Sequence, residues 1–111
     1  MELFNTGDLI LTNFTPQTGH EQAGYRPALV ISSKDFMEKT HFTIICPITH
    51  TDRNFPTHVR VPDGLAVDGY ILCEQLKSLD LISRGAKKVD TLPNNIMNYV
   101  LDIIETFYPN S

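Results

Sequence analysis

With 111 residues, the chain is long enough for one domain, 1–111, that buries a hydrophobic core without disulfide or metal cross-links. Hydrophobic residues make up 41% and charged residues 20%, and no apolar run reaches the length of a membrane span, so the composition favours a soluble globule without membrane segments. The net charge of −4 excludes a uniformly basic surface, so binding of nucleic acid would require the nine Lys and Arg residues to gather locally.

Short apolar or alternating runs bounded by turn residues predict a chain made mainly of strands. The expected strands are 9–14, 28–31, 42–46, 57–61, 70–73, 75–79 and 86–89. Ser33 is expected to cap a short helix over 33–38. Pro47 is expected to end strand pairing on one side of 42–46, because proline has no N–H to donate.

The C-terminal segment has the pattern of an amphipathic helix. Thr91 is the expected N-cap and Pro93 falls in the first turn. The apolar stripe consists of Ile96, Val100, Ile103, Ile104 and Phe107. Several short strands closed by one helix predict a mainly β (α+β) fold, a small barrel on which the helix packs.

A polar loop between the first two strands concentrates chemical groups next to a rigid strand. Its functional side chains are His20, Glu21, Gln22, Tyr25 and Arg26. Such a loop on a buried strand is a common way to build a site. A solvated hairpin loop without a function is the competing interpretation.

The run from Thr18 to Val30, Thr-Gly-His-Glu-Gln-Ala-Gly-Tyr-Arg-Pro-Ala-Leu-Val, closely resembles the first-loop signature of the MazF/PemK toxin family. The similarity extends over 7–107. It includes Gly7-Asp8-Leu9, Cys46-Pro47-Ile48-Thr49, Pro56-Thr57-His58-Val59 and Glu74-Gln75-Leu76-Lys77-Ser78.

This resemblance implies a fold and an activity. The fold would be an SH3-like barrel of the PemK/CcdB type with added helices, working as a homodimer. The activity would be that of a toxin from a type II toxin–antitoxin pair, a metal-independent, sequence-specific endoribonuclease. It would cleave single-stranded RNA by attack of the 2′-hydroxyl, leaving 2′,3′-cyclic phosphate and 5′-hydroxyl ends. A cognate MazE-like antitoxin would hold it inactive, and no cofactor is expected.

Cleavage of this kind needs a group that stabilises charge on the phosphate and a group that moves protons. Arg26 suits the first role because a guanidinium is always charged and grips phosphate through two hydrogen bonds. The resemblance pairs it with the hydroxyl of Thr49. Glu21 is expected to act as the base or to orient Arg26, and a salt bridge that only fixes the loop is an equally serious alternative. His20 has a suitable pKa, but relatives often carry Ser there, so we expect it to contact RNA.

Recognition of RNA needs side-chain amides for base edges and flat groups for stacking. The candidates are Phe14, His20, Gln22, His50, Arg53, His58, Gln75, Lys77 and Ser78. The resemblance supports Gln75, Lys77 and Ser78. Taken alone, Phe14 reads as a core residue, and His58 and Lys77 as ordinary exposed side chains.

The remaining motifs indicate a reducing environment and no metal. The first five residues lack the basic and apolar segments of a signal peptide, so we expect a cytoplasmic protein. Cys46 and Cys73 are expected to be buried thiols, although a disulfide stays open. Together with His50 and His58 they do not have the tight spacing of a zinc site, so none is expected.

Two other functions compete with the nuclease. A toxin of the same fold, like CcdB-type proteins, inhibits DNA gyrase by binding, without the Arg and Thr pair. A degenerate module would bind RNA or antitoxin without cutting. Loss of cleavage with retained binding in Arg26→Ala and Thr49→Ala distinguishes the enzyme from the second alternative.

Overall fold

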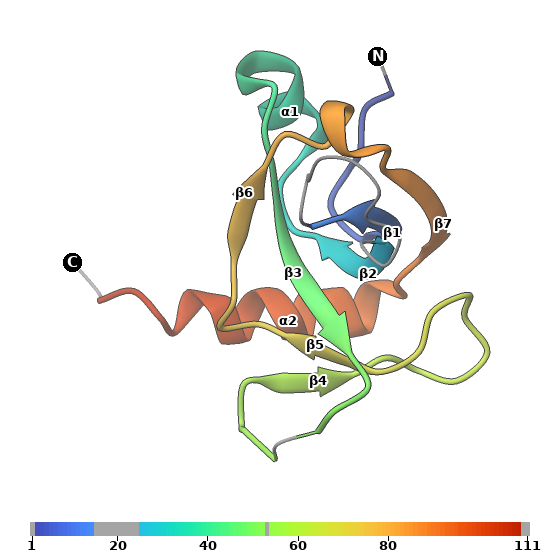
Figure 1. Cartoon of the computed structure of the whole chain (residues 1–111). Coiled ribbons are helices and arrows are strands. Elements are labelled where there is room, and N and C mark those ends of the chain that lie inside the picture. The colour runs from blue at the N-terminus through green and yellow to red at the C-terminus, as the bar shows by residue number, and fades with distance from the viewer. Residues whose placement is uncertain (1, 15–24, 53, 110–111) are drawn as a thin grey trace.

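The computed structural model describes residues 2–14, 25–52 and 54–109, and their fold is built around a strongly curved antiparallel sheet (Figure 1). Within these ranges the strands are β1 (Asp8–Asn13), β2 (Tyr25–Val30), β3 (Thr43–Thr49), β4 (His58–Arg60), β5 (Tyr70–Leu72), β6 (Lys77–Leu79) and β7 (Lys87–Thr91). The helices are α1 (Lys34–Thr40), α2 (Asn94–Glu105) and the short 3-10 helix η1 (Ile82–Arg84). This bears out the mainly β fold with a C-terminal helix.

The strand order is β4-β5-β3-β2-β1-β7, and β6 pairs with β3. The two ends of this order, β4 and β7, do not pair with each other in the described part of the chain, so the curved sheet stays open rather than closing into a barrel. Figure 1 shows β3 as the long central strand, with α1 near one end and the β4–β5 hairpin near the other.

Pro47 marks the place where β3 changes partners. On one side, β3 pairs with β6 up to Ile45 and with β5 from Ile48 onward. The expected interruption at Pro47 is therefore confirmed on that side. The predicted end of the strand at residue 46 is wrong, since Pro47 still stands opposite Ala28 of β2 and the strand runs to Thr49.

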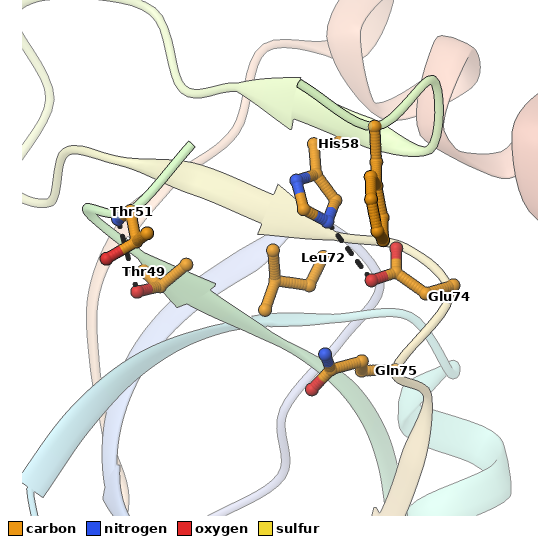
Figure 2. A pocket seen from close by; sticks show the side chains of 7 residues that line it. Thr49, Thr51, His58, Leu72, Glu74 and Gln75 are labelled. Atoms are coloured by element: carbon orange, nitrogen blue, oxygen red, sulfur yellow. Dashed lines mark hydrogen bonds and ion pairs between the residues drawn. The ribbon is translucent and has the colours of Figure 1, made fainter. Parts of the chain in front are cut away.

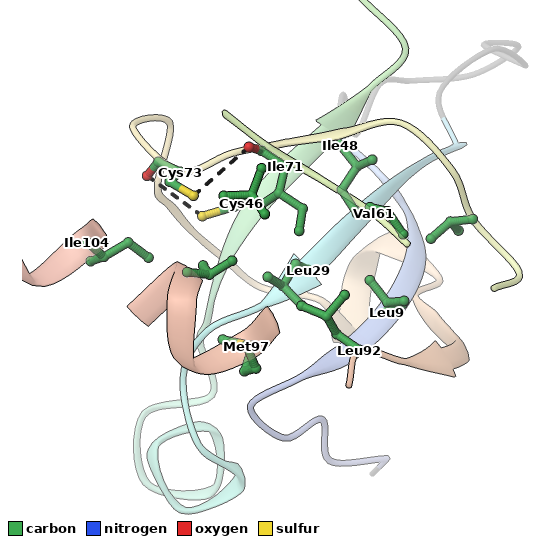
Figure 3. Close-up of a cluster of buried hydrophobic side chains, with 13 residues drawn as sticks. Leu9, Leu29, Cys46, Ile48, Val61, Ile71, Cys73, Leu92, Met97 and Ile104 are labelled. Carbon is green, nitrogen blue, oxygen red and sulfur yellow. Dashed lines mark hydrogen bonds between the residues drawn. The ribbon is translucent and has the colours of Figure 1, made fainter. Parts of the chain in front are cut away.

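Side chains of alternate residues in the sheet point to opposite faces and pack into two separate hydrophobic cores. One face packs against α2, whose buried residues Met97, Val100 and Ile104 meet Leu9 and Leu29 (Figure 3). This confirms that the C-terminal helix covers the sheet. None of the helices in the described residues is long and apolar enough to cross a membrane.

The opposite face of the sheet holds a smaller core. Ile10, Ala28, Val30 and Ile45 alternate with the residues that face α2, and Met37 of α1 completes this cluster. The expected cap of α1 is confirmed, because the Phe36 backbone N–H donates to the Ser33 hydroxyl at 3.1 Å.

The start of α2 differs from the expectation. Thr91 is the last residue of β7, opposite Asp8 of β1, and Pro93 occupies the N-cap position without a side-chain hydrogen bond. Strand pairing thus uses the residue that the local pattern assigned to the helix. The stripe also shifts, because Met97 is buried whereas Phe107 lies beyond the helix end, 37% exposed.

Both cysteines are free and fully buried, as expected for core thiols. The Cys46 thiol lies 3.8 Å from the carbonyl oxygen of Cys73. Burial raises the pKa of the Cys46 thiol far above its ordinary value and raises that of Cys73 to about 11. Since the thiolate is the reactive form, neither thiol is poised for chemistry.

We expect neither cysteine to react with Ellman's reagent at pH 7.5 while the protein is folded. Two thiols should appear when the protein is unfolded in guanidinium chloride. A thiol that reacts within minutes in the folded protein, at a rate independent of denaturant, would contradict the buried placement.

Candidate functional site

Arg26 and Thr49 stand at neighbouring strand ends. The β2–β3 register pairs Ala28 with Pro47, and the same register continued by two residues sets Arg26 opposite Thr49. Directly opposite residues in an antiparallel pair share a face and have Cβ atoms about 5 Å apart. The β2–β3 ladder itself ends at the Ala28–Pro47 pair, so the juxtaposition of Arg26 and Thr49 is an extension of this register, on the face of the sheet that α2 does not cover.

The same row continues across the sheet in both directions. Thr12 of β1 pairs with Arg26, Thr49 pairs with Tyr70 of β5, and Tyr70 pairs with Arg60 of β4. Side chains in such a row share a face. Arg26 and Arg60 are both exposed, and Arg60 lies 2.9 Å from Asp63.

A glycine allows Thr49 to lie where it does. Gly69 has φ +124°, and a Cβ built on it would lie 2.6 Å from the carbonyl oxygen of Thr49. The Gly69 carbonyl in turn accepts a hydrogen bond from the Val61 backbone N–H at 2.9 Å. The end of β3 therefore packs against bare backbone, which only glycine permits.

A pocket of about 230 Å³ opens beside Thr49 (Figure 2). It is lined by Thr49, Thr51, Phe55, His58, Leu72, Glu74 and Gln75. These residues come from the ends of β3 and β5, the start of β4 and the segments that follow them. The pocket combines an apolar floor at Leu72 with hydroxyl, imidazole, carboxylate and amide groups.

His58 and Glu74 form the polar centre of this pocket. The imidazole Nε2 lies 3.1 Å from the Glu74 Oε2, and the Thr57 hydroxyl donates to Oε1 at 2.6 Å. The side chain of His58 is only 5% exposed, and its ring lies 5.1 Å from that of Phe55. Its Nδ1 is buried without a hydrogen-bond partner in the described part of the chain.

The carboxyl of Glu74 is held in its ionised form. Burial alone would raise its pKa, but hydrogen bonds from Thr57, from its own backbone and from His58 together hold the pKa of Glu74 below its ordinary value of 4.5. The pocket therefore presents a carboxylate, an acceptor of hydrogen bonds, throughout the neutral pH range.

The model of PemK-like, MazF-like toxins of type II toxin–antitoxin systems matches residues 5–108. This chain belongs to that family. The Escherichia coli K12 endoribonuclease toxin MazF is 41% identical over 86 residues, covering 78% of this chain and 77% of that protein. The Escherichia coli endoribonuclease PemK is 31% identical over 105 residues, covering 90% and 78%.

Solved structures of the family share the fold. A chain of the MazE–MazF complex (Form-II) from Deinococcus radiodurans superposes with a TM-score of 0.87 at 29% identity, over 100% of both chains. Deinococcus radiodurans MazF (Form-I) superposes with a TM-score of 0.84 at 34% identity, over 96% of this chain and 97% of that one. The resemblance read from the sequence motifs is thus confirmed.

The structure brings together some of the RNA-contact candidates on this PemK/MazF chain. His58 and Gln75 line the pocket beside Thr49. Lys77 shares the Thr49 face, since it pairs with Ile45, and its Nζ lies 5.8 Å from the centre of the Phe14 ring.

The other candidates lie away from this pocket or outside the described residues. Ser78 alternates with Lys77 and therefore lies on the opposite face of β6. His50 lies 2.7 Å from Asp68 on the exposed surface. His20, Glu21, Gln22 and Arg53 lie outside the described residues.

Three residues around His58 were not among the candidates chosen from the sequence. The Phe55 ring lies beside the His58 ring, the Glu74 carboxylate contacts the His58 Nε2, and the Thr57 hydroxyl donates to Glu74. The signal was present, because Thr57 and Glu74 both belong to segments that resemble the family. Thr57 and Glu74 are 17 residues apart in the sequence. They come into contact because β4 pairs with β5, which sets His58 opposite Leu72.

The four residues weighed as a zinc set are not placed as one. Cys46 and Cys73 are in the core, His58 contacts Glu74, and His50 contacts Asp68. Across the described ranges, no three His, Cys, Asp or Glu side chains gather as ligands for a metal ion.

Glu74 makes stability depend on pH in a defined window. Because its folded-state pKa lies below 4.5, the carboxylate stabilises the fold fully above pH 4.5, and this contribution is lost as the pH falls through the lower folded-state value. We expect the wild-type advantage over Glu74→Gln, read as the urea midpoint, to be present at pH 7 and to shrink between pH 4.5 and pH 3. An advantage that grows on acidification would have the wrong sign.

Proposed function

We propose that this chain is the toxin of a type II toxin–antitoxin pair and an endoribonuclease that cuts single-stranded RNA. The observation that supports the proposal is that the β2–β3 register, extended by two residues, leads Arg26 toward Thr49, which lines a pocket rich in hydrogen-bonding groups. Family membership and the endoribonuclease names of the relatives support the reaction class.

In the proposed reaction the substrate supplies its own nucleophile. The 2′-hydroxyl attacks the adjacent phosphorus, the bond to the 5′-oxygen breaks, and the products are a 2′,3′-cyclic phosphate and a 5′-hydroxyl. Arg26 stabilises the negative charge that develops on the phosphoryl oxygens, and the Thr49 hydroxyl donates to one of them. Glu21 accepts the proton of the 2′-hydroxyl or orients Arg26, and water supplies the proton that the departing 5′-oxygen takes up.

The pocket beside Thr49 is proposed to hold one unstacked base next to the scissile phosphate. The exposed ring of Phe55 offers a flat surface for stacking, and the buried ring of His58 lies beside it. The Glu74 carboxylate accepts hydrogen bonds from base amino groups, and the Gln75 amide both accepts and donates. The small volume of the pocket suits a single base better than a larger ligand.

Positive charge on one face accounts for RNA binding by an acidic protein. Arg26, Arg60 and Lys77 lie on the Thr49 face, although Arg60 also contacts Asp63 at 2.9 Å. Local arrangement rather than net charge sets the field near a binding face. His20, Gln22, Phe14, His50 and Arg53 are the further proposed contacts.

We propose the following setting for this activity. The chain is one domain over 1–111, acts as a homodimer in the cytoplasm, and needs no metal. A cognate MazE-like antitoxin inhibits it. Structures of Deinococcus radiodurans MazE–MazF complexes support this partner class.

Cleavage of a long RNA of mixed sequence, in EDTA, tests the proposal. The wild-type protein should make discrete cuts that share a short motif, mapped by primer extension. Arg26→Ala and Thr49→Val should remain folded and lose the cuts. Lys39→Ala removes one cation from α1, at the other end of β3 (Figure 1), and should cut like the wild type.

Intact RNA after incubation with folded wild-type protein would overturn the nuclease. DNA gyrase supercoiling and RNA gel shifts would then be measured, because a binding toxin of this fold and a non-cutting RNA-binding module are the alternatives.

A further inference from the structure

The turn at η1 contacts the end of β1 and the start of β2, the strand that carries Arg26. The Arg84 Nη1 donates to the backbone carbonyls of Asn13 at 3.1 Å and of Phe14 at 2.8 Å. The next residue, Gly85, lies against the Tyr25 hydroxyl, so closely that a Cβ would collide with it. Asn13 and Tyr25 form the last pair of the β1–β2 ladder.

These contacts are one residue away from the proposed catalytic arginine. In the ladder, Thr12 pairs with Arg26, and Asn13 with Tyr25. Arg84 therefore holds the strand that lies directly against Arg26, and the side chain of Tyr25, the residue before Arg26, reaches Gly85. Arg84 is 70 residues from Phe14 in sequence, so this contact is purely tertiary.

The chemistry of the contact favours a guanidinium. Hydrogen bonds from a charged donor are stronger than neutral ones, and Arg84 is half-buried, which limits competition from water. One Arg84 nitrogen bridges two carbonyls, and the guanidinium stays charged at any working pH. A lysine at this position has a shorter reach and presents a point charge.

We propose that Arg84 is a positioning residue, which fixes the β1–β2 end from which Arg26 extends. This inference rests on the proposed nuclease function for its consequence. A misplacement of about 1 Å at a reacting group costs on the order of 10²-fold in rate. The loss should therefore appear in kcat rather than in KM.

The test compares Arg84→Ala and Arg84→Lys with the wild type on an RNA oligonucleotide that the wild type cuts. We expect Arg84→Ala to lower kcat by about 10- to 100-fold, with KM changed less than about threefold. Arg84→Lys should recover part of the rate. Added guanidinium ion at low millimolar concentration should raise the rate of Arg84→Ala but not that of Arg84→Lys or the wild type.

Hydrogen exchange gives a readout that does not depend on cleavage. In Arg84→Ala, backbone amides of residues 12–14 and 25–26 should exchange at least about tenfold faster, whereas those of Leu29 and Ile71 in the larger core should not change. Unchanged exchange at the strand ends, or a kcat equal to wild type, would overturn the inference. If the wild type cuts no RNA, the exchange result still decides whether Arg84 holds these ends.

Discussion

Replacing Arg26 by alanine should lower kcat for RNA cleavage by about 10³-fold, and replacing it by lysine by about 10²-fold. The difference follows from geometry rather than charge. Lysine keeps the positive charge, but it cannot form two parallel hydrogen bonds to the phosphoryl oxygens as the substrate becomes more negative. The measurement is single-turnover cleavage of a labelled oligonucleotide that contains the mapped motif.

We expect the substitution of Arg26 to lower kcat much more than it changes KM. Arg26 is exposed near the start of β2, and in the proposed mechanism its removal deletes an interaction that strengthens in the transition state. KM should change by less than about fivefold while kcat collapses. Lys39→Ala serves as the matched loss of one cation. An Arg26→Lys enzyme within threefold of wild type would show that charge alone is sufficient.

Gly69→Ala should destabilise the protein by about 3 to 5 kcal/mol. Two costs add at this position. Alanine at φ +124° is strained, and its Cβ would lie 2.6 Å from the Thr49 carbonyl oxygen, which belongs to the backbone of β3 and cannot rotate away. Since natural domains are stable by only about 5 to 15 kcal/mol, the urea midpoint should drop steeply.

Gly64→Ala is the control for the conformational cost alone. Gly64 has φ +94°, close to the Gly69 value in kind, but a Cβ there meets nothing within 4 Å. Its substitution should cost about 1 to 2 kcal/mol. Equal losses for the two variants would mean that Gly69 is required only for its backbone angle. A larger loss for Gly69→Ala, with reduced cleavage in the fraction that stays folded, is the result expected from packing against Thr49.

Local pattern was sufficient where one element determined the outcome. The apolar runs located the central strands, and Ser33 indicated the start of α1 because its hydroxyl meets the Phe36 N–H only three residues away. The pattern failed where a distant segment competed. Thr91 has the chemistry of a helix cap, but pairing with Asp8, more than 80 residues earlier, keeps it in β7.

The candidate site divides in the same way. Arg26 and Thr49 were marked by family motifs, and the β2–β3 register, extended beyond its last pair at Ala28 and Pro47, leads the two residues toward each other. The pocket was not predictable residue by residue, since the hydrogen bonds of Thr57 and His58 to Glu74 depend on the β4–β5 register. The alternation of side chains along β6 places Ser78 and Lys77 on opposite faces of the sheet, although the two residues belong to the same sequence motif.

The order in which the sheet is assembled has a consequence for the time at which the protein becomes active. β7 pairs with β1, and α2 covers a core that includes Leu9 and Leu29, so residues near both ends of the chain must meet before the sheet is stable. During translation the last helix emerges after all the catalytic candidates have been made. We expect a growing chain to stay unfolded and harmless to the message that encodes it until α2 has been made. A toxin built this way acts on RNA only after α2 has packed on the sheet, when its inhibitor can already find a folded surface to bind.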